Sequence, residues 1–143
     1  KNLITTESGE LSFWLKASKY PDVLGTTLYR RVLIQGTNIA VNHIYPSWYY
    51  RARSNIVKLI RPNIKNVIIS ELQGEPWVTT SIKDSSREEL NRTMNPAQFE
   101  SIIDFTENIG FPEIYWWGVE WWYYELLNGN DYYWNRAKQL FNQ

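Results

Sequence analysis

The chain has 143 residues, no net formal charge and a pI near 6.8, which suits a single domain with a sizeable core. This balance of charges indicates neither a nucleic-acid nor an anionic-membrane partner, and no stretch approaches the ~18 apolar residues of a membrane span. The lack of cysteine excludes disulfides, and the lone His43 excludes multi-histidine metal sites, so we expect no metal or organic cofactor.

In the first half of the chain, apolar runs alternate with helical patterns. The expected elements are a strand at 2–6, a helix at 9–20, a strand at 22–29 and, after a polar and aromatic connection, a helix at 47–62. The first helix is predicted from the helical spacing of Leu11, Trp14, Leu15 and Ser18. The second helix should have a capping Ser47, a stop at Pro62, and a buried stripe of Ala52, Ile56, Leu59 and Ile60.

In the second half, the apolar run "NVIIS" (66–70) is typical of a strand buried on both faces of a parallel sheet. The expected elements after it are a polar loop with a helical turn at 79–93, a helix at 95–110, a strand with a Trp-rich extension at 113–124, and a final helix at 131–143. The middle helix is the best marked, with a capping Asn95, Pro96 in its first turn and Gly110 at its end. Its buried stripe should be Phe99, Ile102, Ile103, Thr106 and Ile109, and that of the final helix Trp134, Ala137 and Phe141.

Four consecutive strand–helix units predict an α/β fold with parallel strands and right-handed crossovers. No glycine-rich phosphate motif accompanies them. Two architectures fit, a small doubly wound sheet and one half of a (β/α)8 barrel, which needs roughly 250 residues when complete. The long insertions after the second, third and fourth strands favour the barrel, because its active site lies at the C-terminal ends of the strands.

Glu71 is the first candidate for chemistry, because it stands where the apolar run of the third strand stops. Strict alternation would place Ile69, Glu71 and Gln73 on one face of this strand, and Ile68, Ser70 and Leu72 on the other. A carboxylate held by a strand at the rim of a barrel suits a nucleophile or a general base. The structural alternatives are a helix-capping Glu and an ion pair, and Glu75, in the loop before Pro76, is a less rigidly held rival.

A resemblance to a known family rests on "VIISELQGEPW", preceded by "GTTLYR" and followed by "IYWWGVEWWYY". These segments resemble the C-terminal half of cellulase-like glycoside hydrolases of the large retaining clan built on (β/α)8 barrels. The resemblance covers essentially the whole chain, as strands five to eight with their helices. It implies a TIM-barrel fold, carbohydrate as the substrate, and Glu71, in "SEL", as the nucleophile at the end of the seventh strand.

Other residues receive roles in the same way. The resemblance makes Tyr29 a hydrogen-bond partner of the nucleophile and makes Trp116 and Trp117 candidates for lining the sugar subsite. The residues themselves suggest further contacts, with Arg30 pairing with Glu71 to lower its pKa, and Gln73, Trp77 and Glu120 meeting the substrate. The 16% aromatic content fits sugar-stacking platforms as well as core packing. Weaker candidates are Glu7, more consistent with a helix N-terminal acid, and His43.

The departure from the family concerns the second carboxylate. Retaining hydrolysis needs two carboxyl groups roughly 5–5.5 Å apart, and the clan supplies the acid/base from an Asn-Glu pair after strand four. No such pair precedes Glu71. We therefore expect residues 1–143 to be an inactive half of a longer glycosidase, which associates with the missing N-terminal half or with itself through exposed strand edges. The alternatives are a non-catalytic carbohydrate-binding or scaffold domain and a self-contained flavodoxin-like domain.

Overall fold

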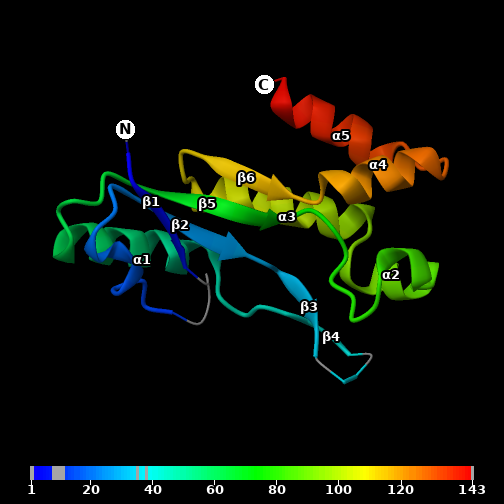
Figure 1. Cartoon of the computed structure of the whole chain (residues 1–143), viewed down its shortest axis with the longest axis horizontal. Coiled ribbons are helices and arrows are strands. Elements are labelled where there is room, and N and C mark those ends of the chain that lie inside the picture. The colour runs from blue at the N-terminus through cyan, green and yellow to red at the C-terminus, as the bar shows by residue number, and fades with distance from the viewer. Residues whose placement is uncertain (1, 8–11, 35, 38, 143) are drawn as a thin grey trace.

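A computed structural model describes residues 2–7, 12–34, 36–37 and 39–142 (Figure 1). The strands are β1 (Ile4–Glu7), β2 (Val23–Leu28), β3 (Arg31–Leu33), β4 (Ala40–Asn42), β5 (Asn66–Gln73) and β6 (Ile114–Trp117). The helices are α1 (Ser47–Ile60), α2 (Arg87–Thr93), α3 (Pro96–Ile109), α4 (Val119–Leu127) and α5 (Tyr132–Phe141). Short 3-10 turns at Ala17–Lys19 and Ile82–Asp84 complete the described elements.

Four of the strands form one parallel sheet, whose order β1-β2-β5-β6 follows the order of the chain. The α/β class and the parallel sheet predicted from the sequence are confirmed. β3 and β4 form a separate antiparallel hairpin within the connection after β2, which the sequence pattern did not indicate. The hairpin, α2 and α4 all lie beyond the C-terminal ends of the sheet strands (Figure 1). The insertions therefore gather at one end of the sheet.

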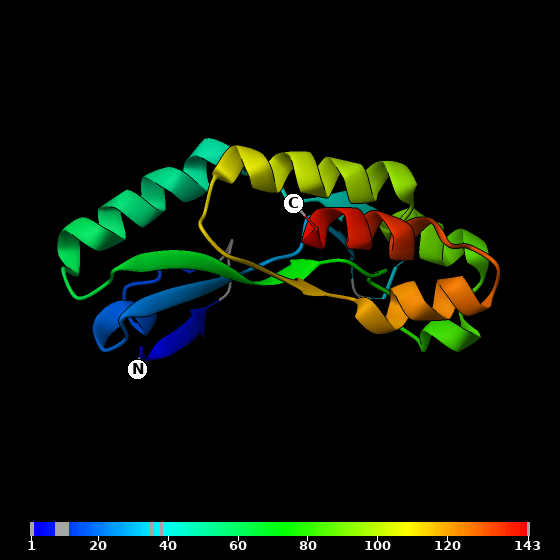
Figure 2. The ribbon, with the colours of Figure 1, turned by 90° about the horizontal axis from the view of Figure 1, so that it is seen from above.

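The helices cover one face of this sheet. Figure 2 shows α1, α3 and α5 on the same side, and none of the described helices runs along the opposite face. The core lies under these helices, and it includes Leu24, Leu28, Val67, Ile69 and Leu72 from the sheet. We call this side the helix face and the other side the open face. A doubly wound sheet would carry helices on both faces and would reverse its strand order, so the flavodoxin-like alternative does not fit.

The predicted helix at 9–20 is wrong for its described residues, since only the single turn Ala17–Lys19 is helical. Trp14 has a positive φ of 61°, which a continuing right-handed helix does not allow. Its ring is nevertheless fully buried, and the Arg53 guanidinium lies 4.0 Å from the ring centre. Tertiary packing therefore decides the conformation here. The remaining predicted residue of the stripe, Leu11, lies outside the described residues.

Helix α1 forms where it was expected, but its predicted cap and stripe are wrong. The residue that caps its N-terminus is Pro46, with no side-chain hydrogen bond, and Ser47 is already helical. Ile56, Leu59 and Ile60 are exposed, Leu59 by 82%. The buried residues are Tyr50, Arg53, Ser54 and Val57. An aromatic and a polar side chain take the place of the aliphatic stripe, because the Arg53 guanidinium packs on the rings of Trp14 and Tyr49.

The predictions for α3 are confirmed. The Asn95 side chain accepts a hydrogen bond from the Gln98 amide, and Gly110 ends the helix in a left-handed conformation. All five residues of the predicted stripe are buried. In the preceding polar loop the expected helical turn is present as α2, which begins with a capping box between Ser86 and Glu89. These helix ends depend on neighbouring residues only, so the sequence predicts them well.

Candidate functional site

A β-bulge in β5 aims Glu71 at the open face. Thr26 pairs with Ile69 and Thr27 pairs with Glu71, so Ser70 is the extra residue between two regular pairs. Ile69 and Leu72 both lie in the core, which strict alternation would not allow. The predicted alternation from Ile69 to Gln73 is therefore wrong. The bulge restores the outward direction for Glu71, which a regular strand would have turned toward the helices.

Tyr29, directly after β2, is the hydrogen-bond partner of Glu71. Its hydroxyl donates to Glu71 Oε2 at 3.1 Å, which is the contact that the resemblance implied. Burial raises the pKa of the Tyr29 hydroxyl above its ordinary value, and the Glu71 and Glu75 carboxylates raise it further. Tyr29 therefore stays protonated and remains a donor.

Glu75 is more firmly held than its position in a loop suggests. Its Oε1 accepts a hydrogen bond from the indole nitrogen of Trp117 at 2.9 Å. The backbone beside Glu75 is held against the end of β6, because the Gly74 amide donates to the Trp117 carbonyl at 2.7 Å. The two backbones also approach closely at Gly118, where an added Cβ would lie 2.9 Å from the Glu75 nitrogen. Only glycine at position 118 permits this approach, and its φ of 136° also favours glycine. The loop and the end of β6 form one rigid unit.

The Trp77 ring lies beside Tyr29, with 5.1 Å between ring centroids in an edge-on arrangement. Thr93, at the end of α2, fixes the backbone of this residue. Its hydroxyl accepts from the Trp77 amide at 2.9 Å and donates to the Trp77 carbonyl at 3.1 Å. Thr93 is fully buried, and sequence analysis missed it because nothing local links it to a residue sixteen positions earlier. Trp77 itself is 43% exposed.

The two tryptophans of β6 separate. Trp117 pairs in register with Gln73, is 53% exposed and belongs with Glu75 on the open face. Trp116 instead stacks on Phe99 of α3 with 5.0 Å between centroids, so it packs against the core and does not join the site. Gln73 is fully buried, and its amide bonds both the N–H and the C=O of Arg31. This amide anchors the hairpin rather than a ligand.

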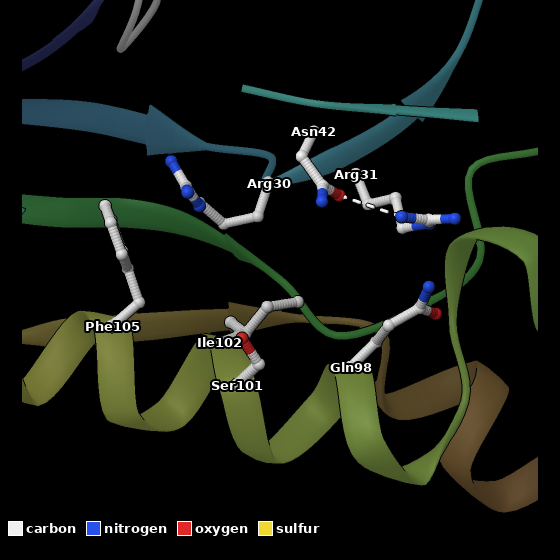
Figure 3. Close-up of a pocket in the computed structure, with 7 residues that line it drawn as sticks. All are labelled: Arg30, Arg31, Asn42, Gln98, Ser101, Ile102 and Phe105. Atoms are coloured by element: carbon white, nitrogen blue, oxygen red, sulfur yellow. Dashed lines mark hydrogen bonds between the residues drawn. The ribbon is translucent and has the colours of Figure 1, made fainter. Parts of the chain in front are cut away.

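Arg30 does not pair with Glu71, so that prediction is wrong. Its guanidinium lies 3.7 Å from the centre of the Phe105 ring and donates to the Tyr45 carbonyl. Arg30 faces the helices, where its guanidinium packs on Phe105 of α3. There it helps to line a cavity of about 120 Å³ between the hairpin and α3, together with Arg31 and Gln98 (Figure 3). This cavity is separate from the Glu71 region.

The remaining candidates are peripheral. Glu120, in the first turn of α4, is exposed and raises the pKa of Glu75 through its charge, which adds to the larger effect of burial. Glu7 ends β1, and His43 follows β4, where its amide donates to the Arg30 carbonyl. We name the residues gathered at the end of the open face the open-face cluster: Tyr29, Glu71, Glu75, Trp77, Trp117 and Glu120.

Two broader properties bear on the kind of site this is. Within the described ranges, no group of three or more His, Asp and Glu side chains is placed to hold a metal ion. In the same part of the chain, no helix combines the length and apolar character needed to cross a membrane.

Comparison of the chain with protein-family models, curated proteins and solved structures found no match in any of the three. The resemblance to glycoside hydrolases therefore rests on the residues of this chain.

Proposed function

We propose that this chain is part of a retaining glycoside hydrolase barrel, corresponding to its strands five to eight, with Glu71 as the nucleophile. The observation that carries the proposal is the hydrogen bond from Tyr29 to Glu71 at the C-terminal end of the parallel strands, with the partly exposed Trp77 beside Tyr29. A carboxylate at that end of a barrel is where such enzymes perform their chemistry.

The sheet supports the barrel assignment in two ways. Its strands follow the order of the chain without reversal, and helices cover one face only (Figure 2). Both features are those of an arc cut from a barrel, in which helices form an outer ring and the other face points inward. The open edges of β1 and β6 would then be the places where further strands continue the barrel.

In the proposed reaction, a Glu71 oxygen attacks the anomeric carbon as the bond to the leaving oxygen breaks. The leaving group departs with the bonding electrons and takes a proton from an acid/base carboxyl. Water then cleaves the glycosyl ester and frees Glu71. Tyr29 donates its hydrogen bond to the Glu71 oxygen and orients the carboxylate. We propose that the acid/base belongs to a part of the barrel other than strands five to eight.

A test follows from the separate roles of the nucleophile and the acid/base. Dinitrophenyl 2-deoxy-2-fluoroglycosides carry a leaving group that needs no protonation, so they report on the nucleophile alone. We expect residues 1–143 to acquire one glycosyl group from one of the gluco, manno, galacto or xylo reagents, located on Glu71 by peptide mass spectrometry. Glu71→Gln should abolish labelling, whereas Glu75→Gln should retain it.

The outcome against the proposal is equally defined. Labelling of another carboxylate, or no labelling by any reagent, would contradict the role of Glu71. Turnover of an unactivated oligosaccharide by residues 1–143 would instead contradict the assignment of the acid/base to another part of the barrel.

The second candidate is sugar binding without chemistry. The observation favouring it is that Trp77, beside Tyr29, and Trp117, bonded to Glu75, are both about half exposed, and partly exposed aromatic side chains with polar neighbours suit sugar stacking. In that case oligosaccharides would bind with the same affinity to Glu71→Gln and to the unchanged chain, and no covalent adduct would form.

A further inference from the structure

The cavity between the β3–β4 hairpin and α3 carries positive charge that the described residues do not neutralise. Arg30 and Arg31 both line it, and the described residues that line it include no Asp or Glu (Figure 3). The ion pairs that join described residues use other cations, namely Lys65, Arg87, Arg92 and Arg136. Two guanidinium groups therefore face one cavity of about 120 Å³ without a counterion from this part of the chain.

Both guanidinium groups are held in place by neutral neighbours. That of Arg30 lies 3.7 Å from the centre of the Phe105 ring and donates one hydrogen bond to a backbone carbonyl. That of Arg31 donates to Asn42 Oδ1 at 3.1 Å and, through Nε, to the Arg92 carbonyl. A guanidinium has more N–H donors than these hydrogen bonds use, so both groups keep donors for a ligand.

Neutral donors extend into the cavity from both of its walls, the hairpin and α3 (Figure 3). Asn42 accepts from Arg31 through Oδ1, so its amide nitrogen remains a donor without a hydrogen bond to another described residue. Ser101 contributes a hydroxyl from α3, and Ile102 and Phe105 supply the apolar part of the lining. Partial enclosure by such side chains lowers the local dielectric, so an anion would interact with the arginines more strongly than in water.

We propose that this cavity binds a doubly charged tetrahedral oxyanion, a phosphate group that is either free or the terminal group of a phosphate monoester. A dianion matches the two cations, whereas a carboxylate would neutralise only one of them. Guanidinium groups also bind phosphate oxygens in pairs, through two parallel hydrogen bonds. The volume suits a small anion, because pockets for drug-sized ligands measure roughly 300–1,000 Å³. Asn42 and Ser101 are exposed, so the rest of a monoester could extend into water.

The inference does not depend on the proposed function, because the cavity includes no residue of the open-face cluster. The structural alternative is that the two arginines only hold the hairpin against α3, through the hydrogen bonds and the ring contact described above. That alternative needs no anion. A direct measurement of anion binding therefore separates the two explanations.

The experiment titrates residues 1–143 with inorganic phosphate, methyl phosphate and acetate by calorimetry. Ionic strength is matched, and the pH is mildly alkaline so that the phosphates are largely dianions. We expect phosphate to bind saturably and at least about tenfold more tightly than acetate, and to raise the midpoint of thermal unfolding. Methyl phosphate that binds as tightly as phosphate would identify the terminal group of a monoester as the ligand, and methyl phosphate that binds much more weakly would identify the free ion.

Matched variants locate the bound anion. Arg30→Gln and Arg31→Gln should each weaken phosphate binding at least about tenfold. Arg51→Gln, at an exposed position of α1, removes the same charge and should leave binding unchanged. Ser101→Glu places a carboxylate in the cavity and removes no hydrogen bond that holds either arginine, so it should abolish phosphate binding in a folded chain. Ser101→Gln is its neutral control and should keep most of the affinity.

Three results would overturn the inference. They are no saturable phosphate binding by the unchanged chain, phosphate binding no tighter than that of acetate, and equal losses of affinity in Ser101→Glu and Arg51→Gln. The last result would assign the anion to the general charge of the chain. Because Ser101→Glu leaves both arginines and their hydrogen bonds in place, the test holds even if Arg31→Gln loosens the hairpin.

Discussion

Trp116 and Trp117 are neighbours in β6, yet they lie on opposite faces of the sheet. Trp116 stacks on Phe99 under the helices, whereas Trp117 is half exposed and donates its indole hydrogen to Glu75. The residue type is the same, and the face of the sheet on which each ring lies determines its contacts. Trp116 packs against the core, while Trp117 stays half exposed and donates a hydrogen bond to a carboxylate.

The carboxylates differ between the two regions in the same way. Glu125 of α4 is fully buried, and both of its oxygens accept from Arg87 at 2.7 Å, with Asn130 donating to one of them. Glu71 and Glu75 have neutral partners only, among the described residues. In α4 both oxygens of Glu125 are held by a cation and an amide. On the open face Glu71 and Glu75 accept from a phenol and an indole, so the ion-paired and the neutrally bonded carboxylates lie in different regions of the molecule.

The largest effect that tests this separation is expected at Phe99. Its buried ring touches those of Trp116, Trp122, Tyr132 and Tyr133. Phe99→Ala should lower the free energy of unfolding by about 3–5 kcal/mol, because it leaves a cavity among rings that cannot close in. Trp117→Ala should cost under ~1 kcal/mol, since half of its surface is already in water, but should abolish sugar binding. Urea unfolding and calorimetry measure the two quantities.

The opposite result would contradict the difference in stability that we expect between the two faces of the sheet. If Trp117→Ala destabilised the chain as much as Phe99→Ala, the open face would belong to the core. Trp117→Phe is the matched control, because it keeps a stacking ring and loses only the hydrogen bond to Glu75.

The next effect concerns Arg87, which is half exposed while its partner Glu125 is fully buried. Arg87→Met should cost about 3 kcal/mol, because it leaves a buried carboxylate without its cation. Glu125→Gln should cost less, about 1 kcal/mol, since Arg87 can turn to water and the amide still accepts from Asn130. Urea unfolding of the two variants checks this. An Arg87→Met penalty no larger than that of Glu125→Gln would contradict the explanation.

The sequence was sufficient for features that depend on nearby residues. The Asn95 cap, the stripe of α3 and the end at Gly110 all follow from spacing within one helix. It failed where distant groups decide. Trp14 leaves the helical region to place its ring beside Arg53, and α1 buries that arginine in place of an aliphatic stripe. No periodicity reveals a cation held on two aromatic rings from other segments.

The candidate site shows the same division. The end of an apolar run identifies Glu71, and the resemblance identifies Tyr29. The bulge at Ser70 and the hydrogen bonds between Thr93 and the Trp77 backbone could not be predicted from the sequence. A bulge arises from the register between two strands, so it has no signature in one of them. The sequence therefore predicts the strand end on which Glu71 lies, but it does not predict which face of the strand each neighbouring residue occupies.

Gly25 offers a test of the bulge, with a smaller expected effect. A Cβ at Gly25 would lie 2.7 Å from Ser70 Cβ and 3.1 Å from Thr6 Cγ2. Gly25→Ala should therefore cost about 1–3 kcal/mol through overpacking, and it should shift Ser70 and with it Glu71. Glycosyl labelling of Glu71 should fall by more than the loss of folded protein explains. Adding Ser70→Gly to Gly25→Ala relieves the contact, so labelling that did not recover would argue against the bulge as the positioning device.

The smallest effect contrasts Glu75 with Glu100 of α3 in their response to pH. Burial raises the pKa of Glu75 in the folded state, whereas hydrogen bonds from Arg136 lower that of Glu100. For Glu75 the folded state holds its proton more tightly, so stability falls as pH rises from the ordinary glutamate pKa through the raised value. For Glu100 the sign is opposite, and stability falls as pH drops from the ordinary value through the lowered one.

Substitution by glutamine separates the two contributions. Glu75→Gln should stabilise the chain at neutral pH relative to acid pH, and Glu100→Gln should destabilise it at neutral pH with a difference that fades in acid. The midpoint of thermal unfolding across pH measures both, with Asp104→Asn as the exposed control. Parallel pH profiles for the two variants would contradict this prediction. They would mean that the folded state stabilises the Glu75 carboxylate as much as Arg136 stabilises that of Glu100. Opposite profiles would mean that Glu75 is kept at a cost in stability, which a merely structural loop residue does not require.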